Sequence, residues 1–261
     1  MTDQPKVLFL DIETAPKVAY VWEFFKQSVS PSQVVSHGHL LCAAWKWLGD
    51  EEVSFERTNL FNIEDDRKLV LCLRNLLDEC HLVVAHNARK FDLPMINARC
   101  LVHGIAPPSP YKVVDTLAVA KKNFRFPSNK LEYLATVLGC GEKLLHNDYP
   151  GFSLWKECMD GNLFAWNDMR RYNMNDVTVL EALYNKMRGW VDVHPNIPAT
   201  TGDKGLACPK CGSHHIQKRG FTTTLLGSYQ RYVCNDCRGW SRSRKKEPAS
   251  TSVLLTNEKS G

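Results

Sequence analysis

The clearest hydrophobic pattern in the chain is an apolar run that leads into two acidic residues. Val7–Leu10 are all apolar, and Asp11 and Glu13 follow directly on either side of Ile12. Such a run predicts a strand buried on both faces. Because side chains alternate along a strand, Asp11 and Glu13 leave the same face. Two carboxylates beside a core repel each other. The stretch therefore indicates either a polar turn or a site for a positive ligand, with a divalent metal ion as the best candidate.

The rest of the pattern predicts strands and helices in alternation. Further apolar runs predict strands over 39–47, 53–55, 82–86 and 111–114. Leucine periodicity predicts a helix over 63–79, and similar patterns predict helices over 93–102, 116–122, 130–138, 153–160 and 163–188. This order is typical of an α/β domain with a mixed sheet. Residues 15–38 are expected to be irregular, and their Trp22, Phe24 and Phe25 are hypothesised to pack over the mouth of a site.

Three later acidic positions have both ordinary and functional interpretations. Asp92 opens a predicted helix, where an N-cap is the simplest role, although capping does not exclude metal binding. Tyr172 and Asp176 lie one helical turn apart and share a face, as many surface pairs do. Asp115 also ends a short strand before a helix, and for this residue we predict an N-cap and no role in a site.

The ordered set of motifs resembles a known enzyme family. Asp-x-Glu at 11–13, Asn-x4-Asp at 87–92 and Tyr-x3-Asp at 172–176 are similar to the motifs of DEDD-type 3′–5′ exonucleases of the tyrosine subclass. The run from Asn87 to Pro94 resembles the proofreading domains of family-B DNA polymerases. The resemblance covers about residues 5–188 and implies a ribonuclease-H-like, mixed five-stranded sheet flanked by helices. It includes no polymerase domain, and residues 15–38 match nothing in the pattern.

The resemblance also implies the catalytic roles. Two Mg²⁺ or Mn²⁺ ions are expected, because hard cations prefer carboxylate oxygens and a pair of ions serves phosphodiester hydrolysis. Asp11 is expected to bridge the ions, Glu13 and Asp176 to complete the site that activates water, and Asp92 to hold the second ion. Tyr172 is expected to orient the attacking water. These five residues are the predicted catalytic set.

Three residues of the first 190 are candidate nucleic-acid contacts. Asn87 and Phe91 are predicted to contact the terminal nucleotides by hydrogen bonding and stacking, although Phe91 is equally well interpreted as a core aromatic. Lys143 lies where similar enzymes often carry a lysine and is predicted to contact a phosphate. His86 and His146 are interpreted as solvated loop residues and not as metal ligands.

Two close cysteine pairs near the C-terminus predict a metal site. Cys208 and Cys211 form one Cys-x2-Cys pair, and Cys234 and Cys237 form a second one 22 residues later. Such pairs in a reducing compartment indicate a tetrahedral Zn²⁺ site and resemble a zinc ribbon. The ion is expected to be structural, because so short a segment has little core of its own. The six other cysteines stand singly and are predicted to be buried thiols.

Positive charge gathers around these pairs. The whole chain carries a formal net charge of +5, whereas residues 201–246 hold ten Lys or Arg and only two Asp or Glu. Lys218, Arg219 and Arg231 alternate there with aromatic residues, which favours a nucleic-acid surface. The alternative is a protein-docking module whose aromatics form its small core.

Composition and segmentation give the remaining expectations. The first residues show no secretory signal pattern, and no apolar stretch has the length of a bilayer, so a cytoplasmic protein without a membrane partner is expected. The predicted division is an exonuclease domain over 1–190, a linker over 191–205, a zinc ribbon over 206–240 and a disordered tail over 241–261.

The sequence therefore predicts a 3′–5′ exonuclease that releases nucleoside monophosphates, with single-stranded DNA as the favoured substrate. RNA is the first alternative substrate, since no motif reports on the 2′ position. A nucleic-acid-binding adaptor with a vestigial nuclease site is the second alternative. A polymerase or another replication or repair protein is a possible partner.

Overall fold

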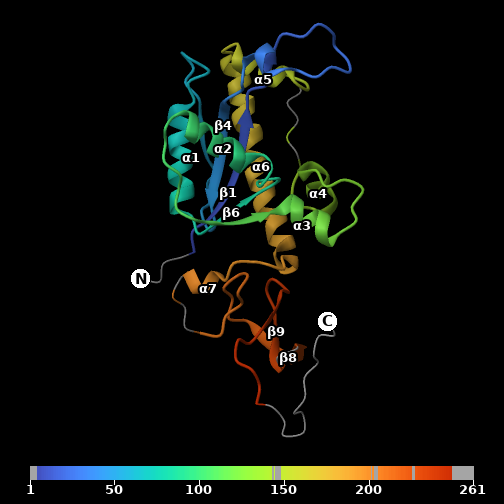
Figure 1. Ribbon diagram of the computed structural model, residues 1–261. Coiled ribbons are helices and arrows are strands. Elements are labelled where there is room, and N and C mark those ends of the chain that lie inside the picture. Colours follow the sequence, from blue (N-terminus) through green and yellow to red (C-terminus); the bar gives the residue numbers. More distant parts are fainter. Residues whose placement is uncertain are drawn as a thin grey trace, which may run out of the picture. The chain divides into compact units, whose positions relative to one another are not determined.

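The computed structural model describes residues 5–142, 144, 148–200, 202, 205–224 and 227–248 (Figure 1). It divides into two compact units, of which one is Lys6–Tyr184 and the other contains the residues from Asn185 onward. Lys143 and His146 lie outside the described residues. None of the helices in the described part of the chain combines the length and the apolar character that crossing a membrane requires.

The first unit is built on a mixed five-stranded sheet, with the order β5-β4-β1-β6-β7. Strand β4 pairs antiparallel with β1 and β5 with β4, whereas β6 is parallel to β1 and β7 to β6. This arrangement confirms the predicted mixed α/β fold. The strands are β1 (Val7–Thr14), β4 (Leu40–Trp47), β5 (Ser54–Arg57), β6 (Leu82–Ala85) and β7 (Lys112–Asp115).

Strand β1 separates an apolar face from an acidic one. Leu8, Leu10 and Ile12 are buried in a core with α1 (Arg67–Glu79) and α2 (Asp92–Val102). The alternate residues face α6 (Leu163–Met187), where the rings of Phe9 and Tyr184 meet edge to face at 5.5 Å. Figure 1 shows α1 and α6 on opposite faces of the sheet. The two-residue period of the strand thus directs Asp11 and Glu13 towards α6.

Shorter helices complete the first unit. They are α3 (Thr116–Asn123), α4 (Leu131–Leu138) and α5 (Ser153–Met159), all close to the predicted ranges. Leu154 and Cys158 of α5 pack with Trp166 and Met169 of α6 in a second core over β4. This core holds α5 and the first turns of α6 against the sheet, and so fixes the position of Tyr172, which belongs to the same cluster.

Residues 15–38 are more ordered than predicted. They contain a short antiparallel pair, β2 (Val18–Ala19) with β3 (Val34–Ser36), and a 3-10 turn at Pro31–Gln33. The turn forms because Ser30 and Gln33 make a reciprocal capping box. The hypothesis that Trp22, Phe24 and Phe25 pack over a site is wrong, since these side chains are 85–94% exposed.

The second unit contains an antiparallel sheet, with the order β10-β9-β8. Its strands are β8 (Ile216–Thr224), β9 (Gly227–Cys234) and β10 (Trp240–Arg242), and a short helix, α7 (Ile197–Thr200), precedes them. The unit extends beyond the predicted 206–240 at both ends. Part of the segment assigned to a linker belongs to this unit, because the Ile197 amide donates to the Pro209 carbonyl at 2.9 Å. Residues 241–242, assigned to a tail, pair with β9.

Candidate active site and zinc centre

The acidic residues of β1 are each held by a side chain from another element. The Asn173 amide of α6 donates to Asp11 Oδ2 at 2.6 Å. The Trp155 indole of α5 donates to Glu13 Oε2 at 3.1 Å. Sequence reasoning missed both partners. The one available signal was that Asn173 lies inside the Tyr-x3-Asp motif and is a polar residue on a helix that must face the sheet.

Asp11 lies among three other carboxylates. Burial raises its pKa well above the ordinary value, and the charges of Glu13, Asp92 and Asp176 raise it further. The hydrogen bond from Asn173 opposes this shift. The structure thus brings together the four acidic residues of the predicted catalytic set, from β1, α2 and α6. An ionised carboxyl in such surroundings costs stability unless a cation offsets the repulsion.

Asp92 begins α2, but it is not the N-cap of that helix. The cap position is Phe91, and no side-chain capping bond is made there. Asp92 is 2% exposed, and burial raises its pKa to about 7. Its own amide and that of Ile12 donate to the carboxylate and oppose the shift, whereas the charge of Asp115 adds to it. Asp92 therefore does not cap the helix, and its carboxylate accepts a hydrogen bond from the backbone of β1.

The loop before Asp92 is fastened by Asp115. This residue is the N-cap of α3, as predicted, and accepts from the Ala118 amide at 3.2 Å. Its carboxylate also accepts from the amides of Asn87, at 3.0 Å, and Arg89, at 3.2 Å. Asn87 has a φ of 74°, a conformation that asparagine tolerates better than most residues. Asp115 therefore ties the loop to α3 and sets the start of α2.

The other predicted residues of this loop have mixed outcomes. Phe91 is 41% exposed, so the interpretation as a core aromatic is wrong, and the stacking role stays a prediction. His86 is neither a ligand candidate nor solvated, because its ring nitrogens bond to Thr116 Oγ1 at 2.8 Å and to the Asn129 carbonyl at 2.9 Å. Lys143 cannot be placed, since it lies outside the described residues.

Tyr172 of α6 is the aromatic member of the set. It is 9% exposed, and its ring meets that of Trp155 edge to face at 6.0 Å. Burial raises its pKa above the ordinary value, as do the charges of Asp176, Glu13 and Asp11 and the hydrogen bond to Asp176. The phenol therefore stays protonated and acts as a hydrogen-bond donor beside the carboxylates.

Divalent cations fit the chemistry of this acidic set. Carboxylate oxygens are the ligands that Mg²⁺ and Mn²⁺ prefer, and positive charge removes the repulsion around Asp11. Among the described residues, the ligand atoms of the four cysteines all lie within 4.8 Å of one another. The four carboxylates do not form so compact a group in this part of the chain.

The four cysteines of the second unit form a compact ligand group. Sγ of Cys208 lies 3.6 Å from that of Cys237, and Sγ of Cys211 lies 3.6 Å from that of Cys234. A hydrogen bond from the Cys211 thiol lowers the pKa of Cys208 to about 4, although burial opposes the shift. Four sulfurs at this separation, with a thiolate among them, fit a tetrahedral zinc site, as the spacing of the pairs predicted.

Basic and aromatic side chains lie side by side on the sheet of the second unit. The predicted contacts Lys218, Arg219 and Arg231 are all exposed. The Arg231 guanidinium lies 5.3 Å from the centre of the Trp240 ring, and a neighbouring pair, Arg242 and Tyr229, has the same contact at 4.3 Å. These contacts keep the arginine planes ordered at the surface.

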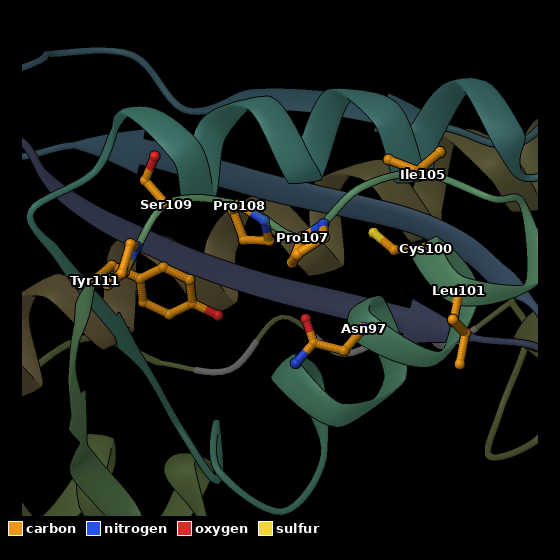
Figure 2. A pocket seen from close by; sticks show the side chains of 9 residues that line it. Asn97, Cys100, Leu101, Ile105, Pro107, Pro108, Ser109 and Tyr111 are labelled. Atoms are coloured by element: carbon orange, nitrogen blue, oxygen red, sulfur yellow. The ribbon is translucent and has the colours of Figure 1, made fainter.

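Two cavities of the first unit lie apart from the acidic set. One, of about 530 Å³, lies between α2 and the proline-rich segment 105–111, and its wall includes Asn97, Leu101 and Tyr111 (Figure 2). The other, of about 510 Å³, is bounded by Arg57 and Trp166 among others. Neither wall contains a residue of the predicted catalytic set.

Comparisons with known proteins agree with this architecture. A family profile described as "RNase_H superfamily" matches residues 32–188, more than half of the chain. The PolC-type DNA polymerase III of Ureaplasma parvum is 27% identical over 173 residues, which is 59% of this chain and 12% of that protein. A family B DNA polymerase from the archaeon Pyrobaculum calidifontis superposes with a TM-score of 0.53 at 16% identity, covering 71% of this chain and 25% of that one. This last likeness shows the fold alone.

Proposed function

Since the chain belongs to the RNase H superfamily, we propose that it is a metal-dependent 3′–5′ exonuclease. In this proposal it hydrolyses phosphodiester bonds from the 3′ end of single-stranded DNA and releases nucleoside monophosphates. The observation that carries the proposal is the crowding of Glu13, Asp92 and Asp176 around the buried Asp11. A fold has no structural reason to hold four carboxylates together, so their purpose is best sought in cations and phosphate chemistry.

Each residue of the set has a proposed role. Asp11 would contribute to the sites of both ions, Glu13 and Asp176 to one of them, and Asp92 to the other. When bound, two such ions supply a nucleophilic water and offset the charge of the leaving 3′ oxygen. Tyr172 orients the water through a hydrogen bond of its hydroxyl group, which the raised pKa keeps protonated. Asn173 is a positioning residue, since it fixes the Asp11 carboxylate at 2.6 Å.

The direction and the substrate are proposed from similarity. The chain spans 12% of the PolC-type relative and 25% of the structural neighbour, both of which are DNA polymerases by name. This favours DNA and a 3′ terminus of the kind that polymerases extend, and it makes a polymerase a candidate partner. The cysteines of the described residues form no disulfide bonds, and we propose on this ground that the protein works under the reducing conditions of the cytoplasm.

The zinc module is proposed to bind the same polymer. Its exposed Lys218, Arg219 and Arg231, with Arg231 against Trp240, combine phosphate attraction with a surface for bases. One structural Zn²⁺ on the four cysteines stabilises the module. In the alternative of a protein-docking module, the same arginines have no need to stand exposed over aromatic rings.

The test uses 5′-labelled DNA and RNA single strands of one sequence, with Mg²⁺ or Mn²⁺. Wild type is compared with Asp11→Asn and with Asp160→Asn, an exposed acid paired with Lys156 outside the site. A ladder that shortens from the 3′ end, and that is lost in Asp11→Asn only, supports the proposal. Faster loss of RNA identifies an exoribonuclease. An intact substrate with well-folded, metal-supplied wild type favours the adaptor alternative.

A further inference from the structure

The segment between β2 and β3 carries aromatic side chains to which the proposed function gives no role. We call residues 20–26 the aromatic arm; Figure 1 shows it within the blue loop that follows β1. Tyr20, Trp22, Phe24 and Phe25 are 77%, 94%, 92% and 85% exposed. Aromatic side chains gathered this closely on a surface usually mark a binding site, because each exposes a large apolar area to water.

Hydrogen bonds close the base of the loop that carries the arm. The Tyr20 amide donates to the Gln33 carbonyl at 2.9 Å, and the Gln33 side chain donates to the Tyr20 carbonyl at 2.8 Å. Next to β1, the Ala15 amide donates to the His39 carbonyl at 2.9 Å. Gly38 has a φ of 79°, and a Cβ there would lie 3.0 Å from the Ala15 oxygen. Glycine permits this close approach, which brings the two ends of the loop together next to β1.

Exposed aromatics also occur at two other segments that adjoin the acidic set. The loop that carries the arm follows β1, which ends one residue after Glu13. Phe91, which is 41% exposed, directly precedes Asp92. Phe152, which is 59% exposed, is the cap residue of α5, the helix whose Trp155 donates to Glu13. Phe91 and Phe152 therefore expose aromatic surface on the segments that carry Asp92 and Trp155, and the arm belongs to the loop that follows β1.

We propose that the aromatic arm is a stacking platform for the unpaired bases of a single strand whose 3′ end lies at the acidic set. The inference rests on the proposed function and adds the path of the strand upstream of the cleaved bond. Aromatic rings stack on every base, so such a platform is indifferent to sequence, as a processive or repeated exonuclease requires. Lys17 and Lys26 flank the arm and attract phosphates, which the carboxylates repel.

The test is a triple variant, Trp22→Ala with Phe24→Ala and Phe25→Ala, in the full chain. Its matched control is Phe61→Ala, because Phe61 is a fully exposed aromatic elsewhere on the same unit. KM and kcat are measured on thymidine oligomers of about three and about 20 nucleotides, lengths that bracket the usual single-strand footprint. We expect KM for the long oligomer to rise about tenfold or more, and its advantage over the short oligomer to vanish. Trp22→Phe, which keeps a stacking ring, is expected to retain most of the affinity.

Different results refute the stacking proposal for the arm and the proposed function. An unchanged KM for the long oligomer in the triple variant refutes the proposal that the arm stacks on bases. The arm then binds a protein or another surface. If wild type cleaves neither oligomer, the proposed function fails. The stacking role of the arm is then tested by binding alone, with a fluorescently labelled long oligomer in the absence of divalent ions. Under these conditions the triple variant must lose affinity for the oligomer, and Phe61→Ala must keep it.

Discussion

Replacing Asp92 by asparagine is expected to stabilise the protein when Mg²⁺ and Mn²⁺ are absent. Burial raises the pKa of this carboxyl from 3.8 to about 7. In the unfolded chain the acid ionises near its ordinary pKa, so between about pH 4 and pH 7 the unfolded state loses its proton first. Ionisation therefore destabilises the fold progressively over this range. Asparagine is of similar size, stays neutral and still offers an oxygen to the Ile12 amide.

The magnitude follows from the shift. About three pH units at 1.36 kcal/mol each give about 4 kcal/mol as the penalty that ionised Asp92 imposes above pH 7. Below about pH 4 the acid is protonated in both states, and the advantage of Asp92→Asn disappears. Bound cations reduce the advantage of Asp92→Asn: an ion at a hundred times its dissociation constant adds about 2.7 kcal/mol to wild type, and the variant gains less.

The assay is urea unfolding from pH 4 to pH 8, followed by helical circular dichroism. Helices α1 to α5 all belong to the first unit, so this signal reports mainly on that unit. The protein is dialysed free of Mg²⁺ and Mn²⁺ without a chelator, so that the cysteines keep any zinc.

The matched control is Asp66→Asn, at a second fully buried carboxylate. Burial alone raises the pKa of Asp66, but hydrogen bonds from Arg99, His103 and the Leu40 amide outweigh it and lower the pKa. Arg99 makes two contacts of 2.7 Å with it. Its stability contribution is therefore present above about pH 4 and lost as the pH falls through the lowered pKa. We expect Asp66→Asn to cost about 3 kcal/mol at pH 8, because the largely buried Arg99 guanidinium, whose side chain is 15% exposed, loses its charged partner.

Opposite signs for the two variants at pH 8 support the electrostatic reasoning. A neutral or destabilising Asp92→Asn at pH 8 without divalent ions would refute it. So would an advantage that is as large at pH 4 as at pH 8, because the effect must follow the ionisation of the carboxyl.

Three further predictions concern catalysis and the zinc module. Tyr172→Phe should lower kcat about ten- to a hundredfold with little change in the Mg²⁺ dependence, since it removes one hydrogen bond to a charged centre; full activity contradicts the orienting role. Lys218→Ala with Arg219→Ala should reduce the slope of log affinity against log salt for single strands by about 1.4, whereas Lys156→Ala should leave it unchanged; equal slopes remove these residues from the interface. Cys208→Ser should abolish the one zinc expected per chain, measured by a colorimetric chelator, and leave the helical signal of the first unit intact; retained zinc shows that the site is not the four-cysteine one.

Local sequence patterns were sufficient to predict the elements that depend on short-range interactions. The apolar run before Asp11, the leucine periodicity of α1 and the paired cysteines each encode one structure over a short range. For this reason the mixed α/β fold, the N-cap role of Asp115 and the cysteine cluster were predictable. The acidic residues were predictable as a set only because their motifs resemble a family, since each motif alone has an ordinary interpretation.

Tertiary packing decided what no local pattern contains. The hydrogen bonds of Asn173 to Asp11 and of Trp155 to Glu13 join residues more than 140 positions apart, and pairing across such a separation leaves no periodic trace. The capping of α2 was mispredicted because the backbone of β1 competes for the Asp92 carboxylate. The ends of the second unit were missed because residues with loop composition become ordered only when the cysteine module offers them partners, as Pro209 does for Ile197. The sequence specified which acidic side chains are present. The fold determined which groups surround them and therefore how their pKa values are shifted.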